Sequence, residues 1–290
     1  MLNLDSKIFI RTLKRRYFNL AINLAGVSIG ITCILLISVY LSHELNFDQH
    51  QSNKNRIYRM VLQLNTNSGS DLHTAENFIG LAHSLKNEFP EVEQAARIHR
   101  YNGEIKVKYK WGDRAYDATH IYRTEQEIFD IFDHEFLLGD PLTALAQPRS
   151  IVITKDLAKK YFGDVSPLNK ALVLDNLVHR VTGVIANLPK QSDLYYEALT
   201  SFDFSEGFTF PNGNADWGNP SAYTYVLLKD KVNLDEFQSK LDRLAKEKTD
   251  AFMMSDYDLK SKVRIYPQKL STLHFQRPVL SELPLGVSER

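Results

Sequence analysis

The pattern of apolar and polar residues divides the chain into one long apolar run and a body of shorter periodic segments. Residues 20–41 contain no charged side chain, and 22 residues of helix span roughly 33 Å, enough for a bilayer core of about 30 Å. This run predicts an uncleaved transmembrane helix. A cleaved signal peptide is the alternative, but its apolar core is only about 7–15 residues long and precedes a small-residue cleavage site. The following "SVYLSHEL" offers no such site.

The two ends of the body repeat one order of elements. Each end shows a strand, a helix and a second strand, predicted at 54–66, 74–89 and 94–101, and again at 221–230, 233–252 and 261–270. Asn233 suits the N-cap of the second helix. Two strand–helix–strand units at the ends of one domain predict an α+β fold with a split, ferredoxin-like sheet.

The middle of the body, roughly 101–220, is rich in alternating segments and predicts a mostly-β inserted lobe. It contains an expected hairpin of 104–111 with 114–124, a short buried strand at 149–154, a helix at 155–163 ended by Gly163, and a second hairpin around Asn176. A polar, glycine-rich loop at 209–221 closes the lobe. The expected architecture is therefore one membrane helix, a split α/β unit and an inserted β-rich unit.

The charges are placed asymmetrically although the net charge is zero. Residues 1–19 carry five basic and one acidic side chain; the part after the apolar run carries 30 basic and 34 acidic residues of the totals of 35 and 35. The positive-inside rule then places the N-terminus in the cytoplasm and the body outside. The orienting residues are Arg11, Lys14, Arg15 and Arg16. A mildly acidic body also argues against nucleic acid as a partner.

Two features of the N-terminal region suggest contact with lipid or with another helix. Apolar residues in 1–19 recur at threes and fours, which favours an amphipathic helix on the cytoplasmic membrane surface; a simple basic flank is the alternative. Gly26 and Gly30 form a small-xxx-small pair, which suits close helix packing in a multi-helix permease. Glycine is common in membrane helices, so the pair is also compatible with a plain anchor.

The stretch "HELNFDQH" after the apolar run begins like the zinc motif H-E-x-x-H. The motif needs a histidine at position 47, which is Phe47, and His50 lies two helical turns from His43 without a third ligand. The stretch is better interpreted as a juxtamembrane collar that joins the membrane helix to the body. Its predicted members are His43, Glu44, Phe47 and Asp48.

Other catalytic and cofactor signatures are missing from the sequence. The chain has one cysteine, Cys33, and no phosphate-binding loop, nucleophile elbow or dinucleotide fingerprint. Asp133, His134 and Glu135 form the closest polar group in the body, and we interpret them as a solvated turn rather than a metal site. We therefore expect a non-catalytic chain with no metal and no cofactor.

The polar loop near residue 209 is the candidate surface for partners. It carries Phe208, Phe210 and Trp217, and aromatic side chains on polar loops often contact partners. A loop that only covers its own lobe is the alternative interpretation.

Three segments in order resemble the MacB-like, FtsX-like family of ABC transporter permeases. They are "LAINLAGVSIGITCILLISVYLSHELNFDQHQSNKNRIYRM", "IFDIFDHEFLLGDPLTALAQPRSIVITKDLAKKYFGD" and "VTGVIANLPKQSDLYYEAL". The resemblance covers nearly the whole chain and implies the following organisation: a cytoplasmic segment at 1–19, the first transmembrane helix at 20–41, a porter-like subdomain at 42–100 and 221–275, an inserted mostly-β subdomain at 101–220, and a tail at 276–290.

The resemblance also implies a function. A separate cytoplasmic ABC ATPase dimerises on ATP, and membrane helices pass its motion to a periplasmic domain that exports or releases a substrate (mechanotransmission). The implied location is the bacterial inner membrane. The implied partners are that ATPase and membrane lipid, with a second permease subunit and periplasmic adaptor proteins as further candidates.

The sequence departs from this family in one respect, because no second apolar run follows residue 275. The chain is then expected to be either a fragment or a truncated relative. A single-pass periplasmic ligand-binding or sensor module is the main alternative. A membrane-tethered hydrolase is a third hypothesis, which lacks any nucleophile–base or metal-ligand spacing.

Overall fold

The computed structural model describes residues 17–45, 50–65, 71–100, 105–109, 115–118, 120–174, 176–189, 192, 194–202, 217–218, 220–256, 262–275 and 280. The chain forms two compact units, residues 1–47 and residues 48–290.

The first unit contains the apolar helix α2, Tyr17–Leu45. Its segment Tyr17–Ser42 has a mean hydropathy of 2.3 and is long and apolar enough to cross a membrane. Apolar side chains along it are exposed, and the Thr32 hydroxyl donates to the Ser28 carbonyl at 2.8 Å. This bond satisfies a polar group within the helix, as a nonpolar environment requires.

Four antiparallel strands and two helices of the second unit form the predicted split sheet. The strands are β1 (Ile57–Asn65), β4 (Val92–Arg100), β13 (Pro220–Leu228) and β14 (Lys262–Lys269). They lie in the order β14-β1-β13-β4 with antiparallel neighbours. Helix α3 (Leu81–Glu88) joins β1 to β4, and α6 (Leu234–Asp256) joins β13 to β14. Strand β13 lies between β1 and β4, so the fold is ferredoxin-like, as predicted.

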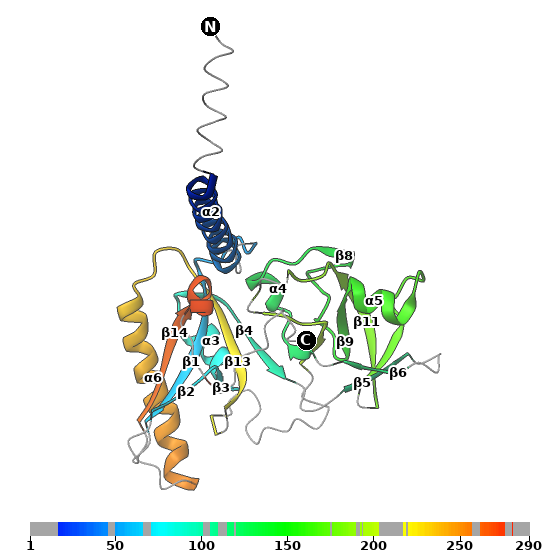
Figure 1. Ribbon diagram of the computed structural model, residues 1–290. Helices are drawn as coiled ribbons and strands as arrows, with labels where there is room; N and C mark the ends of the chain where they lie inside the picture. The colour runs from blue at the N-terminus through cyan, green and yellow to red at the C-terminus, as the bar shows by residue number, and fades with distance from the viewer. Residues whose placement is uncertain are drawn as a thin grey trace. The chain divides into compact units, whose positions relative to one another are not determined.

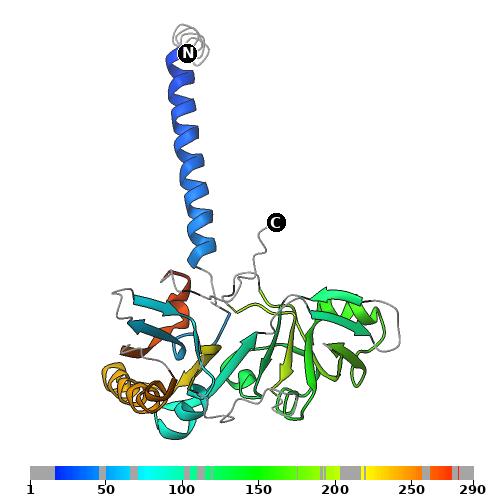
Figure 2. The ribbon, with the colours of Figure 1, turned by 90° about the horizontal axis from the view of Figure 1, so that it is seen from below.

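Helices α3 and α6 cover one face of this sheet (Figures 1 and 2). Phe89 and Phe237 meet edge to face at 5.6 Å between ring centroids, a favoured aromatic geometry. The predicted cap is confirmed, because the Asn233 carboxamide accepts from the backbone of Asp235 and Glu236. The core on this face contains Met60, Leu62, Leu81, Leu85, Val226, Leu241 and Ile265 among others.

The remaining strands continue the same sheet beyond β4. After β4 the order is β7-β12-β9-β11-β10-β5-β6, and β2, β3 and β8 pair at its side with β1, β13 and β11. Their bounds are β2 Asp71–Thr74, β3 Glu76–Phe78, β5 Ile105–Tyr109, β6 Ala115–Ala118, β7 Ile121–Thr124, β8 Phe136–Gly139, β9 Ser150–Thr154, β10 Ala171–Leu174, β11 Leu177–Ile185 and β12 Ala198–Ser201. The short helices are α4 (Ile128–Ile131), α5 (Lys155–Phe162) and η3 (Leu270–Phe275).

The predicted hairpin around Asn176 and the predicted helix ended by Gly163 are both present in this half. Strands β10 and β11 form the predicted hairpin, and Asn176 has a φ of 66°, a conformation that asparagine tolerates. Helix α5 begins at the Thr154 cap, whose hydroxyl accepts from the Leu157 backbone, and ends at Gly163 with a φ of 61°.

Two predicted elements are wrong in detail. The helix expected at 74–89 begins only at Leu81, because Glu76–Phe78 pairs with β13 as β3. The strand expected at 114–124 is two strands: β6 pairs with β5, whereas β7 pairs with β12 and β4. The His120 carbonyl accepts from the Glu197 backbone at 2.8 Å, which draws the second part away from the hairpin. In both cases long-range pairing overrides local pattern.

A second core joins the two halves of the body. The face of the split sheet opposite α3 and α6 contributes Ile57, Ala96, Tyr223 and Tyr225, and the other half contributes Ile131, Phe132, Val152, Leu194, Tyr196 and Leu199. Phe132 and Tyr225 meet edge to face at 5.2 Å. Because one continuous apolar cluster includes both halves, they cannot separate without exposing it to water.

Candidate functional site

The chain segment that leads from α2 into the body is fastened to the loop after α4. The Asp133 backbone N–H donates to Gln51 Oε1 at 2.7 Å, and the Ser52 backbone N–H donates to Asp133 Oδ2 at 2.5 Å. Gln51 is 5% exposed, so its carboxamide needs these partners. We call this reciprocal pair of bonds between Gln51, Ser52 and Asp133 the clasp.

His50 contacts the clasp through the Gln51 carboxamide. Gln51 Nε2 and His50 Nε2 lie 2.8 Å apart. Although the His50 side chain is exposed, desolvation against the body lowers its pKa, and the Asp133 carboxylate partly opposes that effect. The segment that follows α2 thus carries a titratable imidazole, His50, in direct contact with the clasp.

His134 lies beside the clasp and is half-buried. Its Nδ1 donates to the Phe132 carbonyl at 2.8 Å, and its Nε2 is in close contact with the Tyr196 hydroxyl. Since Nδ1 carries the proton, Nε2 accepts from Tyr196. Burial lowers the pKa of His134 to about 4 and raises that of Tyr196 well above 10. Both groups are therefore neutral at pH 7, and Phe129 packs edge to face on the imidazole at 5.1 Å.

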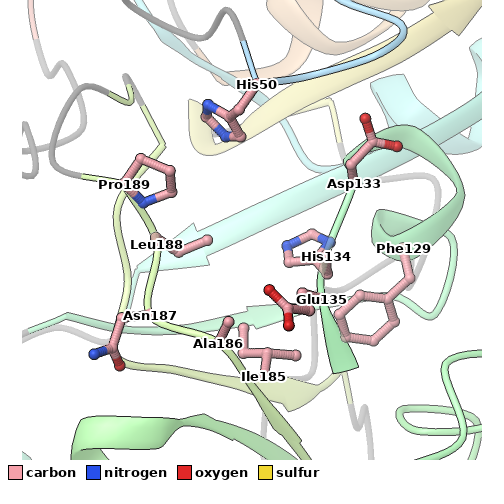
Figure 3. A pocket seen from close by; sticks show the side chains of 10 residues that line it. All are labelled: His50, Phe129, Asp133, His134, Glu135, Ile185, Ala186, Asn187, Leu188 and Pro189. Atoms are coloured by element: carbon pink, nitrogen blue, oxygen red, sulfur yellow. The ribbon is translucent and has the colours of Figure 1, made fainter. Parts of the chain in front are cut away.

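These residues border a cavity of about 570 Å³. Figure 3 shows it between three segments: the chain at His50, α4 with the loop that follows it, and the segment that follows β11. Its lining residues are His50, Phe129, Asp133, His134, Glu135, Ile185, Ala186, Asn187, Leu188 and Pro189. Two carboxylates and two histidines meet an aromatic and aliphatic wall here.

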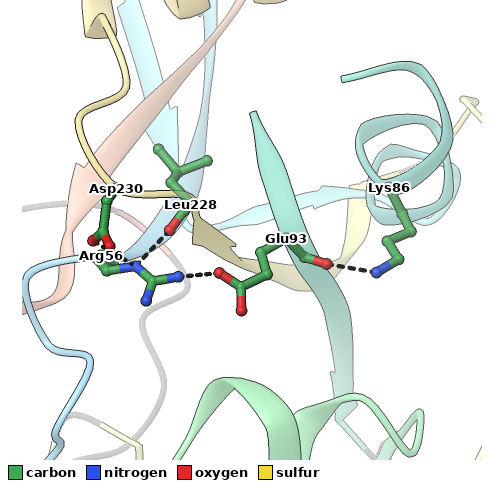
Figure 4. Close-up of polar contacts among 5 residues, drawn as sticks. All are labelled: Arg56, Lys86, Glu93, Leu228 and Asp230. Carbon is green, nitrogen blue, oxygen red and sulfur yellow. Dashed lines mark hydrogen bonds and ion pairs between the residues drawn. The ribbon is translucent and has the colours of Figure 1, made fainter. Parts of the chain in front are cut away.

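Arg56 fastens the same segment a second time, just before β1 (Figure 4). Its Nε donates to the Leu228 carbonyl at 2.8 Å and lies 3.4 Å from Asp230 Oδ1. Its guanidinium also pairs with the Glu93 carboxylate, and Lys86 Nζ donates to the Glu93 carbonyl at 2.6 Å. One arginine therefore links the start of β1 to the end of β13, and through Glu93 to β4.

The polar group at 133–135 is solvated in part, because the Asp133 and Glu135 side chains are exposed, as the solvated turn predicts, whereas His134 is half-buried. Asp133 belongs to the clasp, and the His134 ring contacts Tyr196. Within the described ranges, no three His, Cys, Asp or Glu side chains come together as possible ligands of a metal ion.

The other predicted site residues are only partly described. Gly26 and Gly30 lie on α2, and a Cβ added at either would meet no atom within 4 Å. His43 and Glu44 lie in the last turn of α2. Residues outside the described ranges are Arg11, Lys14, Arg15, Arg16, Phe47, Asp48, Phe208 and Phe210.

The predicted role of Trp217 in a partner-contact loop is wrong. Its side chain is 6% exposed and packs on Phe78 with 5.4 Å between ring centroids. It belongs to the core under α3 and α6, so it cannot offer a ring to a partner at the surface. The indole is buried because its large apolar area stabilises the core more than it would a polar loop.

Sequence reasoning missed Gln51, Ser52 and Arg56 as functional candidates. The hydrogen-bond partners lie 82, 81 and 172 residues away, and no local pattern encodes such pairs. The sequence did contain two polar stretches, one after the apolar run and one at 133–135, which the fold brings together at His50 and Asp133.

Comparison with known proteins identifies relatives of the fold. The family model described as MacB-like periplasmic core domain matches residues 20–244. A solved domain assigned to a permease protein of Porphyromonas gingivalis has a TM-score of 0.65 and 22% identity, covering 81% of this chain and 96% of that chain. No curated protein matches the chain.

Two further solved structures are similar at lower scores. The periplasmic region of MacB from Actinobacillus actinomycetemcomitans has a TM-score of 0.47 and 15% identity, covering 71% of this chain and 87% of its own. The extracellular domain of the noncanonic ABC-type transporter YknZ from Gram-positive bacteria has a TM-score of 0.47 and 16% identity, covering 71% and 98%.

Proposed function

The chain belongs to the family of MacB-like periplasmic core domains, and from this premise we propose that it acts as a permease subunit of an ABC transporter, or as the N-terminal part of one. Permeases of this family work with a cytoplasmic ATPase. In the proposed mechanism ATP binding brings two ATPase subunits together, α2 carries the displacement across the membrane, and the body outside moves to export or release a substrate. The chain itself catalyses no reaction.

The way the chain enters the body is the observation that supports this role. Only residues 46–49 separate the end of α2 at Leu45 from the segment that holds the clasp. Immediately afterwards, Arg56 ties the start of β1 to β13 and β4. A pull on α2 would therefore act on a fastened segment instead of on a slack linker.

The strength of the fastening follows from its hydrogen bonds. An intramolecular hydrogen bond contributes about 1 kcal/mol net, and in the clasp the Gln51–Asp133 bond is part-buried and the Ser52–Asp133 bond is exposed. Gln51→Ala would leave the Asp133 backbone N–H without its acceptor. We expect this change to destabilise the clasp by about 1 kcal/mol while leaving the two cores intact.

The proposed location is the bacterial inner membrane, with the N-terminus in the cytoplasm and the body in the periplasm. The basic residues before α2 support this orientation. A second permease subunit and a periplasmic adaptor are proposed partners in addition to the ATPase and lipid. The open space around Gly26 and Gly30 on α2 is compatible with close approach of another membrane helix.

Co-purification tests the partnership. The full-length protein, solubilised from its own membranes, should bring down an ABC ATPase subunit, and trapping the ATPase with a non-hydrolysable ATP analogue should increase the yield. Failure to associate with any ABC ATPase with ADP, with ATP or with the analogue would sink the proposal.

A glycine insertion tests the coupling itself. Six glycines placed after Asp48 should abolish ATP-dependent changes in hydrogen exchange of the body while the ATPase keeps hydrolysing ATP. The matched control is the same insertion after Asp164, in the exposed turn that follows α5, since surface turns tolerate insertions. Equal ATP-dependent changes in both variants would refute transmission through the collar.

A ligand-binding or sensor module is the second candidate, and the cavity beside His134 favours it. It predicts that a small molecule binding in the cavity stabilises the body in the complete absence of an ATPase. Thermal shifts of the full chain with compounds drawn from the periplasm, compared with an Ile185→Trp variant that fills the cavity, would distinguish the two. Stabilisation lost in that variant, without any ATPase partner, supports the module.

A further inference from the structure

The orientation of the Gln51 carboxamide determines the protonation state of His50. Gln51 Oε1 accepts from the Asp133 backbone N–H at 2.7 Å, and a backbone N–H can only donate. The other end of the carboxamide, the NH₂ group, must then face His50 Nε2 at 2.8 Å. An NH₂ group only donates, so Nε2 must accept and His50 is neutral with its proton on Nδ1.

Protonation of His50 is incompatible with this arrangement. A proton on Nε2 would place two donors against each other at hydrogen-bond distance. The Gln51 carboxamide cannot flip to relieve the conflict, because its NH₂ group would then face the Asp133 backbone N–H. The imidazolium would also attract the Asp133 carboxylate, which already accepts from the Ser52 backbone, so this bond of the clasp competes with the charged ring.

We propose that His50 is a proton sensor for the clasp: it holds the chain from α2 fastened to the body when neutral and releases it when protonated. The ligand of this site is therefore the proton itself. That release would loosen transmission from helix to body in acid, a consequence that rests on the proposed permease function, whereas the opening of the clasp does not.

The groups that face His50 come from two elements besides its own segment. The loop after α4 supplies Asp133, His134 and Glu135, and the segment after β11 supplies the neutral Asn187. Asp133 favours the imidazolium of His50 and desolvation disfavours it more strongly. His134 is neutral until the pH approaches about 4, so it adds no competing charge change in mildly acidic solution.

Hydrogen exchange measured by mass spectrometry on the full chain in lipid nanodiscs, without ATPase, tests the proposal. The backbone amides of Ser52 and Asp133 are the two donors of the clasp and report its opening directly. Protection, corrected for the intrinsic pH dependence of exchange, should fall between pH 8 and pH 5. One linked proton permits a fall of up to about thirtyfold at pH 5, given an open-state histidine pKa of about 6.5.

Two variants separate this mechanism from general acid loosening. His50→Gln keeps an acceptor for Gln51 but cannot titrate, so its protection should stay level from pH 8 to pH 5. Asp133→Asn keeps an acceptor for Ser52 and removes the charge that favours imidazolium in the closed clasp, so its fall in protection by pH 5 should be at least as large as that of the wild type. A level response in the wild-type chain, or an equal fall in wild type and His50→Gln, overturns the sensor.

The result is separable from the permease hypothesis. A pH-dependent clasp in a chain that recruits no ATPase would leave the sensor standing and remove only its role in transport. If the chain couples to an ATPase but exchange at the Ser52 and Asp133 amides does not depend on pH, the permease function stands and the sensor is refuted.

Discussion

His134 should make the body lose stability as the pH falls from 7 to 4. The neutral ring satisfies both nitrogens, one on the Phe132 carbonyl and one on the Tyr196 hydroxyl. Charging the ring would reverse the second bond and place a positive charge in a desolvated setting. Burial lowers its pKa from 6.5 to about 4. Because the folded-state pKa lies below the unfolded-state value, the stabilisation is complete above pH 6.5 and is lost progressively towards pH 4.

The size of the effect follows from the shift. The two pKa values of 6.5 and about 4 differ by about 2.5, and each pKa unit corresponds to 1.36 kcal/mol, so the total is about 3 kcal/mol. Most of it appears early: from pH 7 to pH 5 the unfolded state takes up the proton almost completely, which costs the folded state about 2 kcal/mol.

Guanidinium unfolding of the full chain in detergent, followed by tryptophan fluorescence, measures this at pH 7 and pH 5. His134→Gln keeps a donor and an acceptor without titrating, so its loss of unfolding free energy should be smaller than that of the wild type by about 2 kcal/mol. His99, whose pKa burial and two nearby arginines also lower to about 4, contributes equally to both chains. His83→Gln, an exposed change on α3, is the control.

Equal losses in wild type and His134→Gln would refute this account of the ring. The loss would then come from other groups. An unchanged pH dependence together with a lower stability at pH 7 would show that the buried imidazole acts only through packing. The same two-pH comparison therefore distinguishes a titrating group from a structural one.

Three further predictions concern stability and topology. Gly139→Ala should cost at least about 2 kcal/mol in urea unfolding, because the φ is 92° and an added Cβ would lie 2.3 Å from a backbone oxygen; wild-type stability would contradict the close strand approach. Glu125→Ala should cost about 3 kcal/mol, since it leaves the buried Arg97 guanidinium without its carboxylate; a change below 1 kcal/mol would show that the pair is not needed. In a Cys33→Ser background, Lys231→Cys should react with a membrane-impermeant thiol reagent in intact spheroplasts, and protection until lysis would reverse the proposed orientation.

Much of the fold could be predicted because its signals are local. Residues at alternating or helical spacing determine which face of each element is apolar, and the split sheet follows from two repeated units. Asn233, Asn176 and Gly163 act within a few residues of themselves, at a cap, a turn and a helix end. Such chemistry can be inferred from a short stretch of sequence.

The clasp could not be predicted, because its contacts join residues far apart in the chain. Gln51 is an ordinary polar residue until the fold brings the Asp133 backbone to it, 82 positions away. Trp217 misled in the opposite way: a polar, glycine-rich neighbourhood suggested exposure, but the ring reaches Phe78 in the core. Side-chain reach decides both cases, and periodicity carries no information about it.

Under the proposed permease function, the shared core would let a fastening at one point move the whole body. The clasp holds the chain to Asp133 in the loop after α4. The two residues that precede Asp133, Ile131 and Phe132, are buried in the cluster that joins the two halves. Arg56 meanwhile ties the start of β1 to strands on the other side of that cluster. In the proposed mechanism, a displacement entering at residues 50–56 would act on both halves at once. Because dense cores deform little, the halves should respond together, and a transporter could use the body as a lever without any hinge between them.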